Sequence, residues 1–519
     1  MKTKVFSLRV LVLTVVLSFT LGAASCVGGA PTGPKDGGLP VRDAGRSEGE
    51  GEGQGGEGEG EGAHGCLAPF SIASPEAAEL AAGPAPAIVA FTPIWDRAAL
   101  CESTGVGLEG DDVETTIGDA IIVNATVRGQ PRRIVAALHH AIGENTAALR
   151  GIALLDLASG EPLGCGVIDD AQDGDLALSL ADPTHLVAIA HEEIAAGDPG
   201  HVHIINKFTL DLASMEIVRE QAVFNASTEH AGIQSVITGG NQVVATWNGR
   251  NDLLGVELPS QGPPVWDDNV SEILPNAFSL GFLVVRGQSV LVNVAGSHGS
   301  AVVTVDACGV TQPAGFANLG APPMFFADGN AVLQLAPDLT PQSSSLVIAR
   351  TSGGSTEPNC HFAVQLGDNR FACMHLFDDA RIAVFDGDGS SRNERALPTV
   401  ENGETLGFSG TMVAAADGFL LALATAQVAS GEVIGNRLFI FHDEPGLPEV
   451  ASTLLLLTPA GNAFTGIDAP LVDASGVVLV SALGRIFAFQ TALRGLAPVA
   501  YPRGPVLGGN DARGEQATN

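Results

Sequence analysis

Lysine is nearly absent from this chain, and basic residues as a whole are scarce. The 519 residues include 25 lysines and arginines against 58 aspartates and glutamates, which gives a formal net charge of −33. The only lysines are Lys2, Lys4, Lys35 and Lys207. A protein that binds nucleic acid needs a basic surface to neutralise the phosphates. The composition therefore excludes nucleic acid as a natural partner.

Charged residues of either sign are few, and long helical patterns are missing too. Charged residues make up 16% of the chain and apolar residues 45%, a balance that can bury a core and excludes disorder of the whole chain. The 65 glycines and 30 prolines provide many turns. This composition favours a β-rich fold over a helical bundle.

Complete catalytic and cofactor motifs are also lacking. The chain contains no G-x-x-x-x-G-K-[S/T], H-E-x-x-H or C-x-x-C string. Residues 105–110 match G-x-G-x-x-G, but no strand precedes them and Asp111 and Asp112 follow where an anion would bind, so we predict a loop. His191 begins a His-Glu-Glu string without the second histidine of a zinc protease. We predict no catalytic, cofactor-binding or metal-binding residue, and no cofactor.

The N-terminus has the features of an export signal. Lys2, Lys4 and Arg9 precede an apolar run at residues 10–21, and about 12 residues is shorter than the roughly 20 that span a bilayer as a helix. The alternative is a buried N-terminal helix. The following Gly-Ala-Ala-Ser-Cys, ending at Cys26, resembles the bacterial lipobox, with Ala23 where a leucine is usual. The resemblance implies a signal peptide over 1–25, fatty acyl chains such as palmitate on Cys26, and anchoring in the cell envelope. The outer membrane is expected because no aspartate follows the cysteine.

A low-complexity stretch follows the predicted anchor. Residues 26–65 contain no apolar cluster, and residues 47–62 are almost entirely glycine and glutamate. Such a chain cannot offset the entropy of ordering, and about 38 residues of it span roughly 30–35 Å. We predict a disordered, lipid-anchored linker here and a disordered tail over 509–519. Calcium binding by the acidic run is the weaker alternative.

The body between these ends repeats. Short apolar runs such as residues 133–138, 243–247, 290–294 and 477–481 lie close to turn residues. The clearest repeats end a strand in Leu-Asp-Leu-Ala-Ser, around Asp156 and again around Asp211. Weaker repeats place equivalent positions at 257, 306, 349, 386, 442 and 490, a mean spacing of about 48 residues, which is in the range of propeller blades. We predict an all-β, seven- or eight-bladed β-propeller over 66–508, its last blade completed by an N-terminal strand from residues 87–91 or 120–124. Two stacked β-sandwiches are the alternative.

Two of these repeats resemble a known family. Residues 154–161 and 472–489 are similar to the pyrroloquinoline-quinone-type propeller repeat. In quinoprotein dehydrogenases of that type, tryptophans dock one blade on the next and adjacent cysteines lie near the cofactor. This chain has only Trp95, Trp247 and Trp266 and no adjacent cysteines. The resemblance therefore implies the fold and not the cofactor chemistry.

The chain has seven cysteines. If Cys26 carries lipid, an even number remains in an exported chain, which fits up to three disulfides of open connectivity. We expect Cys66–Cys101 first, because it would fasten the start of the body. Cys360 and Cys373 flank a hairpin, but their pairing depends on a register that the sequence does not fix. The disulfide candidates are Cys66, Cys101, Cys165, Cys308, Cys360 and Cys373.

A few side chains could bind metal ions. His201 and His203 are two apart on a predicted strand and share a face, although the sequence places no third ligand beside them. His139 and His140 alternate faces. The acidic segments 169–175 and 386–390 partly match calcium loops but lack required ligands, so polar turns are the better interpretation.

Two function classes follow. The first is a membrane-anchored extracytoplasmic binding or scaffold protein without catalytic activity. The second is an extracytoplasmic propeller enzyme, a hydrolase, lyase or quinoprotein, with its site in the central channel. The sequence favours the first, since no catalytic set is complete. The acidic body predicts an envelope partner with a basic surface.

Overall fold

The structure is a computed structural model. The chain divides into two units, residues 1–61 and 62–519, and every described residue belongs to the second. The structure describes residues 65–70, 86–98, 114–143, 146–168, 177–195, 201–226, 233–247, 252–260, 263–270, 277–286, 289–296, 299–316, 324–325, 331–334, 346–349, 355–356, 362–367, 369–375, 380–442, 450–457, 470–482 and 485–497.

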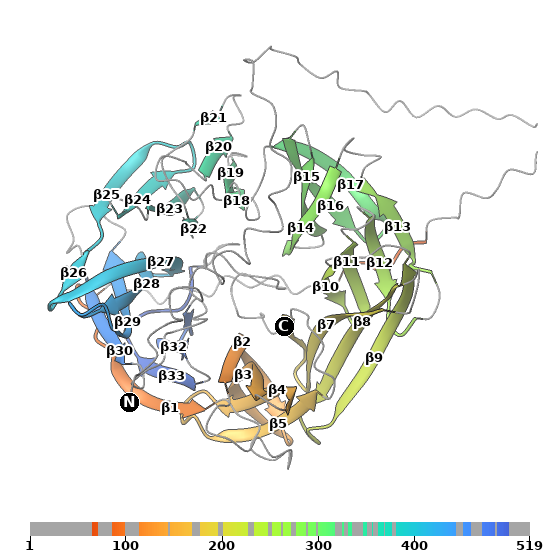
Figure 1. Ribbon diagram of the computed structural model, residues 1–519, viewed down its shortest axis with the longest axis horizontal. Helices are drawn as coiled ribbons and strands as arrows, with labels where there is room; N and C mark the ends of the chain where they lie inside the picture. Colours follow the sequence, from red (N-terminus) through yellow and green to blue (C-terminus); the bar gives the residue numbers. More distant parts are fainter. Residues whose placement is uncertain are drawn as a thin grey trace, which may run out of the picture. The chain divides into compact units, whose positions relative to one another are not determined.

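Within the described residues, the strands form eight antiparallel sheets placed around a common centre (Figure 1). In chain order the first four sheets are β2 (Glu114–Val127), β3 (Gln130–Gly143), β4 (Thr146–Asp156) and β5 (Pro162–Ile168); β6 (Ala177–Asp182), β7 (His185–Ala195), β8 (His201–Asp211) and β9 (Ile217–Ala226); β10 (Ile233–Gly239), β11 (Gln242–Trp247), β12 (Asp252–Glu257) and β13 (Trp266–Asn269); and β14 (Ala277–Arg286), β15 (Ser289–Gly296), β16 (Gly299–Asp306) and β17 (Gly309–Phe316).

The other four sheets complete the set. They are β18 (Met324–Phe325), β19 (Ala331–Gln334), β20 (Leu346–Ala349) and β21 (Ser355–Thr356); β22 (Phe362–Gly367), β23 (Arg370–His375), β24 (Arg381–Asp386) and β25 (Ser391–Ala396); β26 (Val400–Glu401), β27 (Glu404–Ala415), β28 (Phe419–Gln427), β29 (Val433–His442) and β30 (Ser452–Leu457); and β31 (Leu471–Val472), β32 (Val477–Ala482) and β33 (Arg485–Gln490) together with β1 (Thr92–Ala98), which we call the closing sheet.

This arrangement confirms the predicted all-β propeller; the expected number of blades, seven or eight, stays a prediction. The repeat positions read from the sequence each mark the last residue of a strand. In six sheets this is the third strand, after which the chain turns back into the fourth: Asp156, Asp211, Glu257, Asp306, Ala349 and Asp386. His442 ends β29, the fourth strand of its five-stranded sheet, and Gln490 ends β33, which pairs with the N-terminal β1. In the first six sheets the two strands recognised in each repeat are the second and third.

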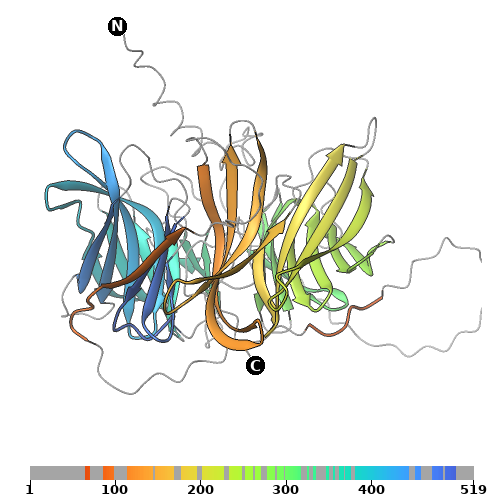
Figure 2. The same cartoon turned by 90° about the horizontal axis from the view of Figure 1, so that it is seen from below.

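The N-terminal strand closes the ring of sheets. β1 pairs antiparallel with β33, with Thr92 opposite Gln490 and Ala98 opposite Arg485, and it lies along the outside of the closing sheet (Figure 2). Of the two segments expected to supply it, residues 87–91 lie immediately before β1 rather than in it, and residues 120–124 belong to β2. Pairing with β33 covers an edge that would otherwise be free to pair with another chain.

Apolar side chains fill the spaces between neighbouring sheets. In β3, Ile134, Ala136 and Leu138 pack toward the β6–β9 sheet, whereas Val135 and Ala137 pack toward the closing sheet. Successive residues of a strand lie on opposite faces, so a strand buried on both faces reads as a continuous apolar run rather than an alternating one. This explains why residues 133–138 and the similar runs were visible as strands.

Two of the three tryptophans fasten one sheet to the next. Trp95 of β1 donates from Nε1 to the carbonyl oxygen of Leu157 at 2.9 Å, which joins the closing sheet to the β2–β5 sheet. Trp266 of β13 donates to the carbonyl oxygen of Ala307 at 3.0 Å, which joins the β10–β13 and β14–β17 sheets. In both cases the accepting residue directly follows a repeat position. The docking role implied by the quinoprotein resemblance is therefore present at two sheet junctions.

Replacement of Gly160 tests the first of these junctions. Gly160 has φ of +67°, and a Cβ added there would lie 2.5 Å from Cδ2 of Trp95. Gly129 has φ of +76°, but a Cβ there would meet nothing within 4 Å. Both alanine variants bear the cost of a left-handed backbone, so Gly160→Ala should lose roughly 1–3 kcal/mol more than Gly129→Ala through overpacking. Urea-unfolding midpoints would measure this, and equal losses would show that Trp95 is not held against Gly160.

Candidate functional site

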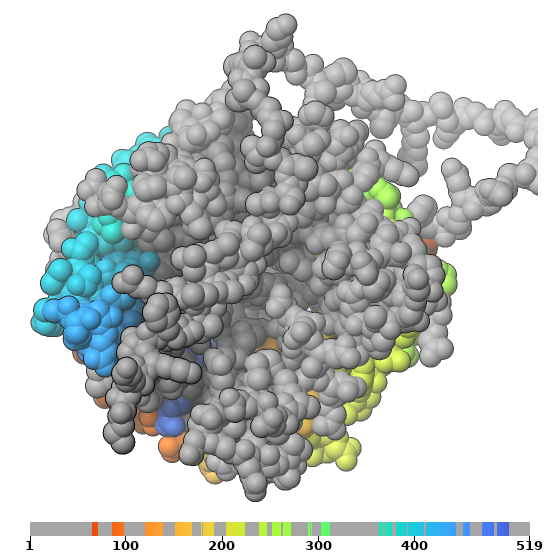
Figure 3. Space-filling model, viewed as in Figure 1, coloured from red at the N-terminus to blue at the C-terminus, as the bar shows by residue number. Residues whose placement is uncertain are grey.

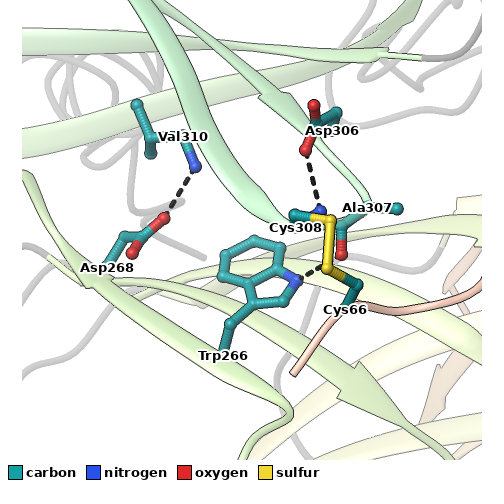
Figure 4. Close-up of a disulfide and its surroundings, with 7 residues drawn as sticks. All are labelled: Cys66, Trp266, Asp268, Asp306, Ala307, Cys308 and Val310. Carbon is teal, nitrogen blue, oxygen red and sulfur yellow. Dashed lines mark hydrogen bonds between the residues drawn. A yellow bond between two sulfur atoms is a disulfide. The ribbon is translucent and has the colours of Figure 1, made fainter. Parts of the chain in front are cut away.

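The chain leading into the propeller is attached by a disulfide. Cys66 is bonded to Cys308, 242 residues later, in the turn between β16 and β17 (Figure 4). The expected Cys66–Cys101 pairing is therefore wrong. The partner of Cys66 could not be predicted from the sequence, because it depends on which sheet lies beside residue 66. That sheet is distant in sequence. The expected role, fastening the start of the body, is the one the bond performs.

Noncovalent contacts hold the same lead-in segment, residues 65–70. The amide of Leu67 donates to the carbonyl oxygen of Ala307 at 2.8 Å, the same oxygen that accepts from the Trp266 indole. Leu67 and Phe70 are buried in the core shared by the β10–β13 and β14–β17 sheets. The lead-in segment is thus part of the junction between two sheets.

The turn that receives the lead-in segment is fixed by carboxylates. The amide of Cys308 donates to Asp306 Oδ1 at 2.8 Å, and the amide of Val310 donates to Asp268 Oδ2 at 2.6 Å (Figure 4). Asp306 belongs to β16 and Asp268 to β13, so the backbone around Cys308 is held from both sheets. These two hydrogen bonds thereby position Cys308 for its bond with Cys66.

Two further cysteines, Cys165 and Cys373, are disulfide-bonded, and the sulfur that each joins lies outside the described residues. Cys26, Cys101 and Cys360 also lie outside them. The prediction of lipid on Cys26 and the pairing of Cys360 with Cys373 therefore stay predictions.

Cysteine mapping checks the lead-in disulfide. A digest of the non-reduced protein should yield a peptide pair joining Cys66 to Cys308, and Cys101→Ser should leave that pair joined. Cys308→Ser should cost about 3–5 kcal/mol of unfolding free energy, because the bond restricts a very long loop in the unfolded chain. A peptide joining Cys66 to Cys101 would contradict the structure.

Carboxylates recur at one edge of the sheets. We call the turn edge the edge at which hairpins join the first strand to the second and the third to the fourth. Asp156 Oδ1 accepts from the amides of Ala158 and Ser159 at 3.1 and 3.0 Å. Burial raises the pKa of Asp156, but hydrogen bonds from Ser159, Arg132 and Ala158 outweigh burial and leave that pKa below its usual value. This turn corresponds to the repeated Leu-Asp-Leu-Ala-Ser pattern of the sequence.

The β6–β9 sheet has the same chemistry at both of its turns. In the turn between β8 and β9, the amide of Ala213 donates to Asp211 and lowers its pKa. In the turn between β6 and β7, Asp182 accepts from Thr184 at 2.7 Å and lies 2.8 Å from His185 Nδ1. Burial raises the pKa of Asp182, but these partners together lower it below the ordinary value. Asp156, Asp182 and Asp211 at the turn edge therefore all have a lowered pKa.

An ion pair at the turn edge joins the first and last parts of the chain. Arg133 of β3 donates from Nε to Asp473 Oδ1 at 2.9 Å and from Nη2 to the same oxygen. The Asp473 side chain is 4% exposed. Burial raises its pKa, but the charge of Arg133 and hydrogen bonds from Ser475 and Arg133 lower that pKa below its ordinary value. The pair thus supplements β1 in closing the ring.

Acid titration checks this ion pair. Because the pKa of Asp473 is depressed in the folded state, its stabilising effect is present above the unfolded value near 3.9 and is lost as pH falls through the folded pKa. Asp473→Asn should lower the free energy of unfolding by about 3 kcal/mol at pH 7. This is the low end of the cost of breaking a buried ion pair, because the Arg133 side chain is partly exposed.

The difference from the unmodified protein should shrink as pH falls from 5 to 2 in urea-unfolding measurements. Asp96→Asn is the matched control, since Asp96 and Arg485 form an exposed pair at 3.1 Å in the same sheet, and such pairs contribute about 0–1 kcal/mol. A constant difference for Asp473→Asn at every pH would contradict the assignment.

Two other buried ion pairs were not foreseen from the sequence. Arg437 of β29 donates to Glu404 of β27 at 3.0 and 2.6 Å. Lys207 of β8 lies 3.3 Å from Glu220 of β9 and donates to the carbonyl oxygen of Gly240 at 3.0 Å. A charged residue in the middle of an apolar strand was the available signal. These pairs fix strands and junctions, which suits a structural role.

The structure describes some of the residues considered as metal or nucleotide ligands and not others. The glycine string at 105–110 and the acidic segment 169–175 lie outside the described residues. The segment 386–390 is a polar turn, in which Ser390 donates to Asp388 Oδ1 at 2.8 and 2.7 Å. His139 and His140 lie on β3, His191 on β7, and His201 and His203 on β8.

Figure 3 shows the described residues of the β6–β9, β22–β25 and β26–β30 sheets at the rim of the ring. Where side chains are described, no group of three or more His, Cys, Asp or Glu residues is placed to hold a metal ion. Within the described part of the chain, no helix has the length and apolar character needed to cross a membrane.

No protein-family model and no curated protein matches the chain. Among solved structures, the β-propeller domain of the Trilobed protease from Pyrococcus furiosus is 11% identical with a TM-score of 0.34, over 75% of this chain and 97% of that chain. The N-terminal domain of Nup159 is 9% identical with a TM-score of 0.30, over 80% and 98%. A europium-containing methanol dehydrogenase is 10% identical with a TM-score of 0.31, over 59% and 75%.

These similar structures include enzymes and proteins of other kinds. They assign no particular activity to this chain.

Proposed function

We propose that this protein is a lipid-anchored binding or scaffold protein of the bacterial cell envelope. The lipid is attached to Cys26, the glycine- and glutamate-rich linker spans the distance to the propeller, and the propeller binds a partner rather than a substrate. The outer membrane is the expected location.

The attachment of the lead-in segment carries this proposal. A membrane-held tether transmits force to the lead-in segment, where Cys66 is bonded to Cys308 and Leu67 and Phe70 are buried between two sheets. Tension therefore acts on a covalent bond at a sheet junction rather than on β1, whose loss would open the ring. A disulfide also suits an oxidising compartment outside the cytoplasm.

The charge of the chain indicates the kind of partner. The net charge is −33, and the pKa values of Asp156, Asp182 and Asp211 at the turn edge are lowered. The lead-in segment joins the propeller at Cys308, itself in a turn between third and fourth strands. A partner with a basic surface is favoured because opposite charges speed encounter and like charges oppose it.

Replacing Cys26 tests the anchor. Expressed with its own N-terminus in a Gram-negative host, the protein should fractionate with membranes, and mass spectrometry should find an acylated Cys26 as the first residue. Cys26→Ala should abolish acylation and membrane association. Cys101→Ala is the matched control and should stay in the membrane fraction. An unmodified N-terminus on a soluble native protein would contradict the proposal.

Affinity capture from native membranes tests the binding role. The proposal expects a stoichiometric partner with a basic surface, whose retention weakens as ionic strength rises. Failure to capture a partner, together with turnover of a small substrate by the purified propeller, would establish the enzyme alternative instead.

A further inference from the structure

Cys165 of β5 forms a disulfide with a sulfur outside the described residues. The lead-in disulfide uses two of the other cysteines, and Cys373 forms a disulfide of its own. Three possible partners remain: Cys26, Cys101 and Cys360. We infer that Cys165 is bonded to Cys101, so that the chain leaving β1 is joined to the outermost strand of the β2–β5 sheet. This inference is independent of the lipid anchor.

The Cys165 side chain lies on the face of its sheet that packs against the closing sheet. Cys165 is paired with Ala153 of β4, and directly opposed residues share a face. Ala153 is buried in the core that the β2–β5 sheet forms with Trp95, Leu479 and Ala488 of the closing sheet. Cys165 therefore faces the sheet that contains β1.

The two glycines that flank Cys165 give the same direction. A Cβ added to Gly164 would lie 2.6 Å from Sδ of Met215, and one added to Gly166 would lie 2.7 Å from Cδ1 of Leu210. Both contacted side chains belong to the β6–β9 sheet and its turn. Because successive residues of a strand point to opposite faces, the half-buried Cys165 points away from the β6–β9 sheet.

β1 and β5 run in the same direction at the outside of neighbouring sheets. β1 starts at the turn edge, where Thr92 pairs with Gln490, and β5 starts there as it leaves the β4–β5 turn. The two are in contact near their starts, because the Trp95 indole donates to the carbonyl oxygen of Leu157 in that turn and packs against Gly160. Distances along both strands can therefore be measured from this contact.

The chain lengths from that contact match. Cys165 is five residues after Gly160, about 16 Å along a strand. Cys101 is six residues after Trp95, and six residues of extended chain cover about 20 Å. It is also three residues after Ala98, the last residue of β1, a reach of about 10 Å, and packed sheets lie about 10 Å apart. The Cys101 thiol can therefore reach Cys165 across the junction.

Cys360 cannot reach Cys165. It is two residues before Phe362, the first residue of β22, so the chain keeps it within about 7 Å of that strand. The β22–β25 sheet packs on the β26–β30 sheet, which packs on the closing sheet, which packs on the β2–β5 sheet. Three junctions of about 10 Å each therefore separate β22 from Cys165, and more sheets intervene in the other direction around the ring.

Cys26 is disfavoured by the length of chain that precedes the propeller. It is 39 residues before Gly65, whose amide is bound to the carbonyl oxygen of Val265 in another sheet junction. The entropic cost of bringing two points together rises with the number of residues between them. A thiol three residues from a fixed strand therefore meets Cys165 at a much higher effective concentration.

This assignment has a consequence for the remaining cysteines. With Cys101 bonded to Cys165, Cys360 is left for Cys373, the pairing that the β22–β23 hairpin predicts. Cys26 then has no cysteine to pair with and keeps the thiol that acylation requires. The Cys101–Cys165 bond also holds the chain end of β1 beside β5, so a β1 that leaves β33 stays close enough to pair again.

Peptide mapping of the full-length, non-reduced protein tests the bond. Cleavage after lysine and arginine places each candidate cysteine in a different peptide: 98–128 for Cys101, 151–207 for Cys165, 351–370 for Cys360 and 371–381 for Cys373. After free thiols are blocked with a maleimide, peptide 98–128 should be found joined to peptide 151–207.

Two other results are distinguishable. Peptide 151–207 joined to peptide 351–370 would overturn the inference and leave the lipid anchor untouched. Peptide 151–207 joined to the peptide containing Cys26 would overturn both the inference and the anchor.

Serine variants test the same bond without peptide mapping. Cys101→Ser and Cys165→Ser should lower the urea-unfolding midpoint equally, and the double variant should lower it no further, because all three lose one bond. Cys101→Ser combined with Cys373→Ser should show the sum of its two single effects. Additive losses in the Cys101→Ser, Cys165→Ser double variant would show that the two cysteines belong to different bonds.

Thiol labelling keeps this test valid if a variant is less stable. In urea without reductant, a maleimide should label Cys165 in Cys101→Ser. Cys308→Ser is the matched control, in which Cys66 should be labelled and Cys165 should not. An unlabelled Cys165 in Cys101→Ser would refute the pairing.

Discussion

Burial of apolar side chains between neighbouring sheets is the interaction on which this structure depends. A sheet such as β2–β5 sends one set of side chains toward the β6–β9 sheet and the alternate set toward the closing sheet. Neither face can be left in water at low cost, because apolar burial contributes about 25 cal/mol per Å². Each sheet therefore needs a neighbour on both sides, and only a closed arrangement supplies one to the first and last sheets.

Closure gathers specific polar contacts at the junctions of the ring. The apolar core is not directional, whereas the Trp95 indole, the Arg133–Asp473 pair and the Cys66–Cys308 bond each require one partner in one place. The Trp95 indole and the Arg133–Asp473 pair both join the closing sheet to the β2–β5 sheet. The apolar core thus favours sheet packing in general, and the polar contacts select which sheets pack together.

The fold could be predicted from local signals, while the attachment points could not. An aspartate such as Asp156 or Asp211 both ends a strand and caps the following turn, so it leaves a short, repeated pattern in the sequence. The first and fourth strands do not carry this repeated pattern. The partner of Cys66 depends on which sheet lies beside it. That is a property of spatial arrangement, and a single sequence contains no local trace of it.

The position of β1 has a consequence for how the protein is made. Its partner strand lies near the far end of the chain, and Asp96 and Arg485, which form an ion pair between the two strands, are separated by 389 residues. Because a chain is synthesised from its N-terminus, β1 therefore emerges long before β33. The Cys66–Cys308 bond becomes possible earlier, as soon as the fourth sheet has emerged. Covalent fastening of the N-terminal segment can thus precede ring closure and limit how far β1 diffuses while it waits for its partner.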